Sequence, residues 1–275
     1  MNAQLEQKVV LVTGAAGGIG SSLARKFAAE GARLILHYHS RQAEAEQLSA
    51  ELAHTGAVAI QADLSQESQV IELFSRARSA FGRIDTLVAN AAIWVEGEVP
   101  LHEMSLAQWN RTLAVDLTAV FICCREFMKL VREQRRGNVV LISSTAGVFG
   151  EAGHADYASA KSALAYGFTR TLKNEISRIA PHTTDYCGGR INCICPGWTI
   201  TPRTQPRLAN REVIRKVTTT MALPQIARPD DVAHMAVFLA SDTLARHITG
   251  QTIVIAGGME GRVLWQADEI DPDTV

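Results

Sequence analysis

Short apolar runs rich in β-branched residues alternate along the chain with segments of helical periodicity. Such runs are typical of strands that are buried on both faces of a sheet. We expect strands within residues 8–13, 34–36, 58–60, 86–89, 139–142, 191–194 and 252–255, and helices over 19–30, 42–54, 67–81, 105–134 and 157–179. Strands separated by helices of crossover length indicate a parallel sheet. With no internal repeat or linker, the sequence predicts a doubly wound, parallel seven-stranded α/β sheet with helices on both faces, in a single domain spanning 1–275 with a core at about 8–258.

Several chemically distinctive residues directly follow expected strands. A glycine-rich turn at residues 14–20 follows the first strand, Asn90 follows the fourth, Ser144 the fifth and Pro196 the sixth. In parallel sheets, ligands bind in a crevice beyond the carboxyl ends of the strands. We therefore expect these residues to converge on one crevice.

The composition excludes several classes of protein. With 27 Lys and Arg against 28 Asp and Glu, the formal net charge is −1, so we expect no nucleic acid and no anionic membrane as partner. The first residues are polar, and no stretch reaches the roughly 18 apolar residues that span a bilayer, so we expect a cytoplasmic protein. The five cysteines lack the spacing of a zinc site. We expect no metal and reduced core thiols, with a redox pair at Cys193 and Cys195 as the alternative.

Residues 13–20 read Thr-Gly-Ala-Ala-Gly-Gly-Ile-Gly, between the first expected strand and the first expected helix. Glycines permit a tight turn and let backbone N–H groups approach phosphate oxygens, while the helix N-terminus adds partial positive charge. The spacing of Gly14, Gly18 and Gly20 differs from the G-x-G-x-x-G of other dinucleotide folds. We interpret the turn as a pyrophosphate site; the alternative is an ordinary glycine-rich loop.

Together with later motifs, this turn resembles the short-chain dehydrogenase/reductase family, from about residue 8 to 258. The family's Y-x-x-x-K motif matches Tyr157 and Lys161, its catalytic serine matches Ser144, and its N-N-A-G motif is partly kept at residues 89–92. The resemblance implies a Rossmann-like fold, oxidoreductase activity, a nicotinamide cofactor and a homo-tetramer or homo-dimer. Besides Tyr157 and Lys161, the cofactor contacts that it implies are Gly14, Gly18, Ile19, Gly20, Asp63, Leu64, Asn90, Ala91, Pro196, Gly197, Thr199 and Thr201.

Tyr157 and Lys161 lie four residues apart, on one face of an expected helix. A free tyrosine has a pKa of about 10 and is a poor base at neutral pH. An ammonium about 4 Å away stabilises the phenolate by about 4 kcal/mol at an effective dielectric of about 20. Tyr157 would exchange a proton with the substrate oxygen, to which Ser144 would donate a hydrogen bond. The alternative is an amphipathic helix with a core tyrosine and an exposed lysine.

One position departs from the family pattern. The family's V-N-L motif appears here as Val115, Asp116 and Leu117. In the family, the main-chain carbonyl of the replaced asparagine holds a water that connects to the lysine. That main-chain role survives the change, and the carboxylate is also able to pair with Lys161. We expect Asp116 to be a tolerated substitution and count it among the catalytic residues.

The residues after the second strand bear on the choice of cofactor. An acidic residue there would bind the ribose 2′-hydroxyl of NAD, and by alignment with the family Tyr38 takes its position. His39, Ser40 and Arg41 follow; the serine is a donor and the arginine offers a forked cation suited to phosphate. We therefore expect NADP(H) in preference to NAD(H). The alternative is that Arg41 caps the next helix.

Trp94, His154 and Trp198 are candidate walls of the substrate pocket, which favours an uncharged or amphipathic carbonyl compound. The alternatives are a core Trp94 and a solvated His154. Residues 201–221 are expected to cover the substrate. Their arginines are more simply explained as exposed helix charges than as contacts with an anion: Arg203, Arg207, Arg211 and Arg215.

Two segments differ from the family average. Residues 181–189 form a long connection before the sixth strand, so we expect them at the amino end of the sheet, on the surface or in an oligomer contact. In the tail over 259–275, Val263, Leu264 and Trp265 could dock on a neighbouring subunit, with a disordered end as the alternative.

The sequence thus predicts an NADPH-dependent carbonyl reductase or secondary alcohol dehydrogenase, similar to 3-oxoacyl reductases, that acts on a small molecule. The second hypothesis is a regulator or scaffold that binds the cofactor without turnover. Ser144, Tyr157 and Lys161 count against it, and Asp116 is the feature in its favour. Thioesters, sugars, steroids and small ketones all remain as substrates, because fold and motif do not choose among them.

Overall fold

In the computed structural model, which describes residues 3–263, 266, 269, 270 and 272, the chain forms a seven-stranded sheet in the order β3-β2-β1-β4-β5-β6-β7. Every neighbouring pair of strands is parallel. The strands are β1 Val9–Val12, β2 Arg33–Tyr38, β3 Val58–Gln61, β4 Thr86–Ala89, β5 Asn138–Ile142, β6 Arg190–Pro196 and β7 Thr252–Ile255. The predicted doubly wound parallel sheet is confirmed. Successive strands are added on one side of β1 up to β3 and on its other side from β4 onward, and such folds place their ligands at this switch between β1 and β4.

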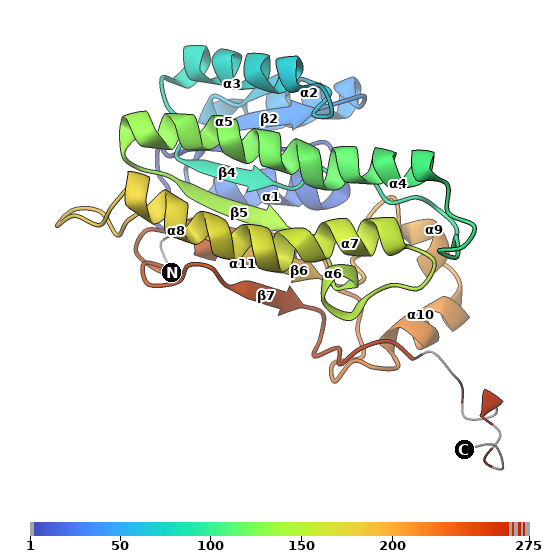
Figure 1. The fold of residues 1–275 in the computed structure, drawn as a ribbon. Helices are drawn as coiled ribbons and strands as arrows, with labels where there is room; N and C mark the ends of the chain where they lie inside the picture. Colours follow the sequence, from blue (N-terminus) through green and yellow to red (C-terminus); the bar gives the residue numbers. More distant parts are fainter. Residues whose placement is uncertain (1–2, 264–265, 267–268, 271, 273–275) are drawn as a thin grey trace.

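Helices cover both faces of the sheet, because alternate residues of each strand face opposite sides. Val9 and Leu11 of β1 pack with α3, α5 and α8, whereas Val10 and Val12 pack with α1, α2 and α11 on the other face (Figure 1). The helices are α1 Gly18–Ala29, α2 Gln42–Glu51, α3 Glu67–Phe81, α4 Leu106–Leu113, α5 Ala119–Gln134, α6 Ala146–Phe149, α7 Ala155–Ala163, α8 Thr169–Ile179, α9 Gln205–Leu208, α10 Arg211–Thr218 and α11 Pro229–Ala240.

Two long helices expected from the sequence are each interrupted by one wider turn. A π-helical turn over Ala114–Thr118 separates α4 from α5, and a second over Leu164–Phe168 separates α7 from α8. The first of these turns packs against α7. One extra residue in a turn hardly changes the apolar pattern of a helix, so the sequence did not reveal either interruption. Such π-turns occur frequently at functional sites.

Different segments lie at the carboxyl ends and at the amino ends of the strands, which are called here the carboxyl edge and the amino edge of the sheet. At the carboxyl edge lie α9, α10 and the connection from β4 to α4 (Figure 1). At the amino edge lies the segment 181–189, as expected, since it leads into β6. There the hydroxyl of Tyr186 accepts from the Gly137 N–H at 2.9 Å and donates to the Gly137 carbonyl at 3.1 Å. This segment is therefore anchored to the start of β5 rather than to the crevice.

Other expectations concern the cysteines, the tail and membrane spans. All five cysteines are free thiols, and Cys193 and Cys195 lie in the core on one face of β6.

In the tail, Leu264 and Trp265 lie outside the described residues, so the expected docking of that segment stays a prediction. Across the part of the chain that the structure describes, no helix has the length and apolarity needed to cross a membrane.

Candidate active site

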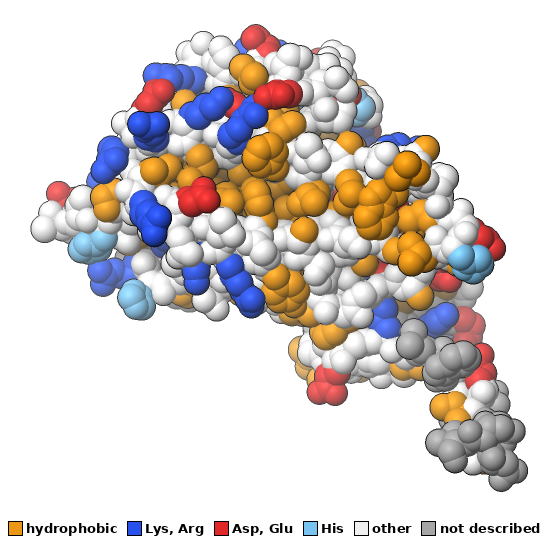
Figure 2. Space-filling model, in the orientation of Figure 1, with side chains coloured by type: hydrophobic (Ala, Val, Ile, Leu, Met, Phe, Trp, Pro, Cys, Tyr) orange, Lys and Arg blue, Asp and Glu red, His pale blue; other side chains and the backbone are white. Residues whose placement is uncertain are grey.

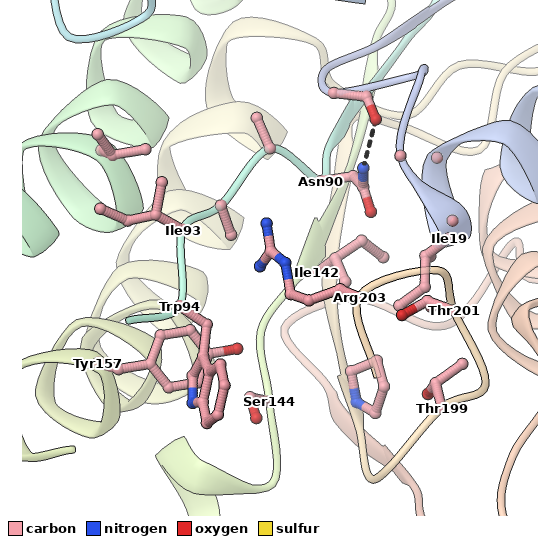
Figure 3. Close-up of a pocket in the computed structure, with 18 of the residues that line it drawn as sticks. Ile19, Asn90, Ile93, Trp94, Ile142, Ser144, Tyr157, Thr199, Thr201 and Arg203 are labelled. Carbon is pink, nitrogen blue, oxygen red and sulfur yellow. Dashed lines mark hydrogen bonds between the residues drawn. The ribbon is translucent and has the colours of Figure 1, made fainter. Parts of the chain in front are cut away.

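A cavity of about 570 Å³ lies at the carboxyl edge of the sheet, between the glycine turn and the segment that carries α9. Figure 3 shows Tyr157, Trp94 and Ser144 on one side of it and Ile19, Thr199 and Thr201 on the other. Most of the predicted site residues line it: Gly14, Gly18, Ile19, Gly20, His39, Ser40, Arg41, Asp63, Leu64, Asn90, Ala91, Trp94, Ser144, Tyr157, Lys161, Pro196, Gly197, Trp198, Thr199 and Thr201. The expected convergence is thus present. Asp116 and His154 lie behind this lining.

The glycines of the turn are needed where they stand. Gly14 has φ +65°, in the left-handed region, and a side chain there would meet the Cα of Ala91 at 3.0 Å. A Cβ on Gly20 would lie 2.1 Å from the Gly14 carbonyl oxygen, and one on Gly18 would lie 2.7 Å from the Cβ of Thr201. The turn is therefore closely packed on both sides, and its backbone borders the cavity directly.

Asn90 and Thr13 hold the glycine turn against the end of β4. The Asn90 amide nitrogen donates to the carbonyl oxygens of Thr13 at 2.9 Å and of Gly14 at 3.2 Å (Figure 3 draws the side chain). The Thr13 hydroxyl oxygen accepts from the backbone N–H groups of Asn90 at 2.9 Å and Ala91 at 3.0 Å. Asn90, predicted as a cofactor contact, therefore also shapes the turn.

His37 is a part of the site that the sequence argument did not identify. Its Nδ1 accepts from the Gly14 N–H at 3.0 Å, and its Nε2 lies 3.0 Å from the Ala62 carbonyl oxygen. Burial lowers the pKa of His37 to about 4, so the ring is neutral at pH 7 with its proton on Nε2. The available signal was a polar residue directly after the apolar run Leu34, Ile35 and Leu36 of β2.

Tyr157 and Lys161 lie on α7, and Ser144 follows β5 across the cavity from Ile19. Lys161 is only 2 % exposed; its Nζ donates to the Ile142 carbonyl at 3.3 Å and lies 5.5 Å from the centroid of the Tyr157 ring. The alternative of an exposed lysine is therefore wrong. A buried ammonium next to a phenol is an arrangement suited to proton transfer.

The pKa of Tyr157 differs from the expectation of a lysine-stabilised phenolate. Burial raises this pKa above its ordinary value, and its effect exceeds the opposing one of the Lys161 ammonium. The Asp116 carboxylate raises the pKa further, whereas the hydrogen bond with Ser144 lowers it. Desolvation of the buried phenol is the larger influence in this site, and the spacing of Tyr157 and Lys161 in the sequence does not reveal it. With these neighbours, Tyr157 keeps its proton at neutral pH.

Asp116 is fully buried on the first π-turn, behind the cavity wall. Its Oδ1 accepts from the Ile93 N–H at 2.8 Å, and its Oδ2 lies 3.8 Å from Lys161 Nζ. Among the described residues, no group donates a hydrogen bond to Oδ2. Burial raises the pKa of this carboxyl, and Lys161 and the Ile93 N–H oppose that effect. The pairing with Lys161 that the sequence suggested is thus present as a long ion pair.

The substrate side of the cavity is more charged than the sequence suggested. Trp94 and Trp198 line it, whereas His154 is buried behind Trp94 with the two ring centroids 4.8 Å apart. Arg203, Arg207, Arg211 and Arg215 are all exposed, as expected, but Arg203 and Arg207 also line the open cavity. Figure 3 shows Arg203 reaching into the cavity. Three further charged lining residues were missed: Arg111, Glu151 and Arg262.

Comparison with known proteins shows the family of this chain. A family model described as enoyl-(acyl carrier protein) reductase matches residues 14–260, nearly the whole chain. The chain belongs to the short-chain dehydrogenase/reductase family. It is therefore an oxidoreductase that acts on C=O or CH–OH groups. Members of this family use nicotinamide dinucleotides.

Two curated relatives and one solved structure are similar to this short-chain dehydrogenase/reductase over most of their length. A 3-oxoacyl-[acyl-carrier-protein] reductase of Synechocystis sp. is 34% identical over 257 residues, covering 93% of this chain and 98% of the relative. A cis-4-hydroxycyclohexanecarboxylate dehydrogenase of Sinomonas cyclohexanicum is 33% identical over 262 residues, covering 94% and 98%. The crystal structure of gox2181 superposes with a TM-score of 0.84 at 27% identity, covering 94% of this chain and 97% of the other.

The cavity fits the dinucleotide that this family uses. The closely packed glycine turn leads into the N-terminus of α1 and lines the cavity, which places its backbone where a pyrophosphate can approach. Ser40 and Arg41 line the same cavity after β2, and of the described carboxylates none forms an ion pair with Arg41. Asp63 also lines the cavity. Its carboxylate accepts hydrogen bonds from the hydroxyl of Ser65 at 2.7 Å and from the backbone N–H of Ser65 at 3.0 Å, and these bonds lower the pKa of Asp63.

Proposed function

We propose that this protein is an NADP(H)-dependent carbonyl reductase, or secondary alcohol dehydrogenase, of the 3-oxoacyl reductase type. The observation that carries the proposal is that Ser144, Tyr157 and Lys161 border the same cavity as the glycine turn. The similarity to a 3-oxoacyl-[acyl-carrier-protein] reductase and to a dehydrogenase of a cyclic hydroxy acid supports this reaction class.

In the proposed mechanism, the bound cofactor supplies the hydride. The Ser144 hydroxyl donates a hydrogen bond to the substrate oxygen and holds it near Tyr157. As negative charge develops on that oxygen, the Tyr157 hydroxyl donates its proton to it. The Lys161 ammonium, buried beneath the ring, stabilises the phenolate that remains. Lys161 also offers N–H donors for the ribose of the cofactor.

The raised pKa of Tyr157 suits its proposed role as the general acid in reduction. A general acid must carry its proton at the working pH, and burial keeps the phenol protonated. Oxidation of an alcohol needs the deprotonated form, which this environment disfavours. We therefore expect the rate of alcohol oxidation to rise with pH, as more of Tyr157 becomes deprotonated.

Replacing the proton donor tests the mechanism. In Tyr157→Phe, we expect turnover to fall by about 10²–10⁴-fold, the range typical of lost general acid catalysis. Cofactor binding should persist, because the glycine turn is unchanged. Reduction of a ketone panel is followed by NADPH absorbance, and binding by quenching of protein fluorescence. If Tyr157→Phe binds the cofactor and retains near-normal turnover, the proposed role of Tyr157 is refuted. If the wild-type protein binds the cofactor but turns over no substrate, the scaffold hypothesis is favoured.

The cofactor preference has its own test. We propose that Ser40 and Arg41 bind the 2′-phosphate, since Tyr38 provides no carboxylate to repel it. Wild type should show a higher kcat/KM for NADPH than for NADH. In Arg41→Ala the NADPH value should fall by about 10- to 100-fold, as expected for a lost hydrogen bond to a charged group, with NADH little changed. The control is Arg76→Ala, which replaces an exposed arginine on α3 that does not line the cavity. Equal wild-type values for both cofactors would contradict this assignment.

The active form is proposed to be a homo-dimer or homo-tetramer. Figure 2 shows hydrophobic side chains gathered along the face of α4 and α5, where Leu106 and Phe121 are 72% and 46% exposed. An exposed apolar face of this kind suits contact with a second copy of the chain.

A further inference from the structure

The guanidinium of Arg207 contacts two indole rings. Its central carbon is 5.0 Å from the ring centroid of Trp94 and 5.0 Å from that of Trp198. Trp94 is itself backed by His154, which is 3% exposed. Arginine prefers the faces of indole rings, so these contacts give this side chain of the short helix α9 a defined place.

Arg207 has donors that the protein does not use. A guanidinium carries five N–H donors and no acceptor. Among the described residues, none accepts a hydrogen bond from Arg207 or forms an ion pair with it, although Arg25, Arg83 and Arg190 all have such partners. Stacking on rings leaves the donors of the guanidinium available to a ligand in the cavity that Arg207 lines.

The charges around this part of the cavity are unbalanced. Arg111, Arg203 and Arg262 line the cavity together with Arg207, whereas its acidic lining side chains are Asp63 and Glu151. Glu151 is already paired with Arg262 at 3.6 Å. The buried Asp116 faces Lys161 instead. A cleft lined by one sign of charge attracts ligands of the opposite sign.

The arginine and the reacting groups face one cavity. Trp94, which contacts Arg207, lies on the same side of it as Tyr157 and Ser144 in Figure 3. A molecule whose carbonyl oxygen meets Ser144 and Tyr157 would therefore have its other end within the region of Trp94, Trp198 and Arg207. The indoles would contact an apolar body, and the guanidinium would bind an anionic group.

We propose that the substrate is a compact ketone, or the matching secondary alcohol, that carries a carboxylate, and that Arg207 binds this carboxylate. The inference rests on the proposed function and names its substrate class. The phosphate of a phosphopantetheine thioester shares the same anionic chemistry. It is separated from the carbonyl by a long chain, however, whereas Arg207 contacts Trp94, which lies on the same side of the cavity as Tyr157 and Ser144. That geometry favours the carboxylate.

Matched substrates test the proposal in the wild-type enzyme. The reductions of 4-oxocyclohexanecarboxylate, its methyl ester and its amide are compared with NADPH, as are levulinate and methyl levulinate. We expect kcat/KM for each acid to exceed that for its neutral partner by about 10- to 100-fold, the range of a hydrogen bond between charged groups. Equal values for acid and ester would overturn the proposal while leaving the reductase function intact.

Variants identify the responsible residue. In Arg207→Met, which removes the charge but keeps an unbranched chain, the acid-to-ester ratio should fall towards one. Arg207→Lys, which keeps the charge without the fork, should give an intermediate ratio. Arg211→Met removes the same charge from the same segment, outside the cavity, and should keep the wild-type ratio. If Arg211→Met lowers the ratio as much as Arg207→Met, general electrostatics act instead of a direct contact, and the proposal is wrong.

A binding measurement separates this proposal from the proposed function. Cyclohexanecarboxylate, which contains no carbonyl to reduce, is titrated against indole fluorescence, with the carboxamide as its neutral partner. Carboxylate binding that Arg207→Met abolishes supports the anion site even if no ketone is turned over. A preference seen only between 3-oxobutanoyl phosphopantetheine and 3-oxobutanoyl pantetheine, and lost in Arg207→Met, would overturn the carboxylate and assign the phosphate.

Discussion

At the scale of single residues, Tyr157 is subject to opposing electrostatic influences. Burial and the Asp116 carboxylate raise its pKa, whereas Lys161 and the hydrogen bond with Ser144 lower it. Because Asp116 is also 3.8 Å from Lys161, it weakens the effect of that ammonium on the phenol. Asp116 is therefore expected to act as a positioning residue, through Lys161 and the field at Tyr157.

The pH profile of alcohol oxidation reports on this carboxylate. Asp116→Asn removes a negative charge that raises the pKa of Tyr157, so that pKa should fall. Oxidation requires deprotonated Tyr157. The acidic limb of the pH profile for oxidation should therefore move to lower pH in Asp116→Asn. The measurement is kcat/KM for oxidation from pH 5 to 10, with Asp185→Asn in the segment 181–189 as a distant control. An unchanged acidic limb in Asp116→Asn would show that the carboxylate has no special role.

At the scale of elements, the close approach of α6 to α7 brings Ser144 to the helix of Tyr157. A Cβ on Gly147 of α6 would lie 2.5 Å from the carbonyl carbon of Lys161 and 2.6 Å from the nitrogen of Ser162. The Ser143 hydroxyl donates to the Lys161 carbonyl at 2.7 Å across the same contact. Because the neighbouring atoms are backbone, they cannot yield without moving the helix. Glycine at 147 thus sets the spacing between the two catalytic segments.

Gly147→Ala should disturb this spacing. Overpacking of this kind costs about 1–3 kcal/mol of the free energy of unfolding, and the shift of α7 should also lower kcat. Gly167→Ala is the matched control, since a Cβ there meets nothing within 4 Å and alanine favours helix. Urea unfolding and ketone reduction measure the two effects. If both variants behave like wild type, α6 and α7 have room to separate and the contact does not set the geometry.

At the scale of the whole molecule, the site lies where the two halves of the sheet meet. His37 connects three parts of that junction: it belongs to β2, accepts from the N–H of Gly14 after β1, and bonds the carbonyl of Ala62 after β3. These bonds need the neutral ring, whose pKa burial holds at about 4. Protonation of His37 therefore opposes the folded state.

The stability of the protein should fall as the pH drops from about 6.5 to about 4. In that range the unfolded chain protonates His37 and the folded chain does not, so unfolding takes up a proton. The contribution is about 3 kcal/mol at most. Urea unfolding is measured across this range for wild type, His37→Gln and the exposed-site control His102→Gln. His37→Gln should lose less stability than wild type on acidification; parallel curves for all three proteins would rule out His37 as the source.

The alternation of strands and helices, the parallel sheet and the convergence of the glycine turn, Asn90, Ser144 and Tyr157 were all predictable from the sequence. Each depends on local information: the period of apolar residues, glycine at a turn, and the rule that parallel strands end at one edge. The number and spacing of the cysteines likewise predicted core thiols, which holds for four of them, whereas Cys187 is half-buried.

Only the tertiary structure decided the electrostatics and the substrate side of the site. Arg111 of α4, Arg207 of α9 and Arg262 near the C-terminus are far apart in sequence and meet at one cavity. The rise in the pKa of Tyr157 depends on how much protein surrounds it, which no spacing of residues encodes. Periodicity determines which face of an element is buried, but the neighbours of a charged group are set by the packing of distant elements.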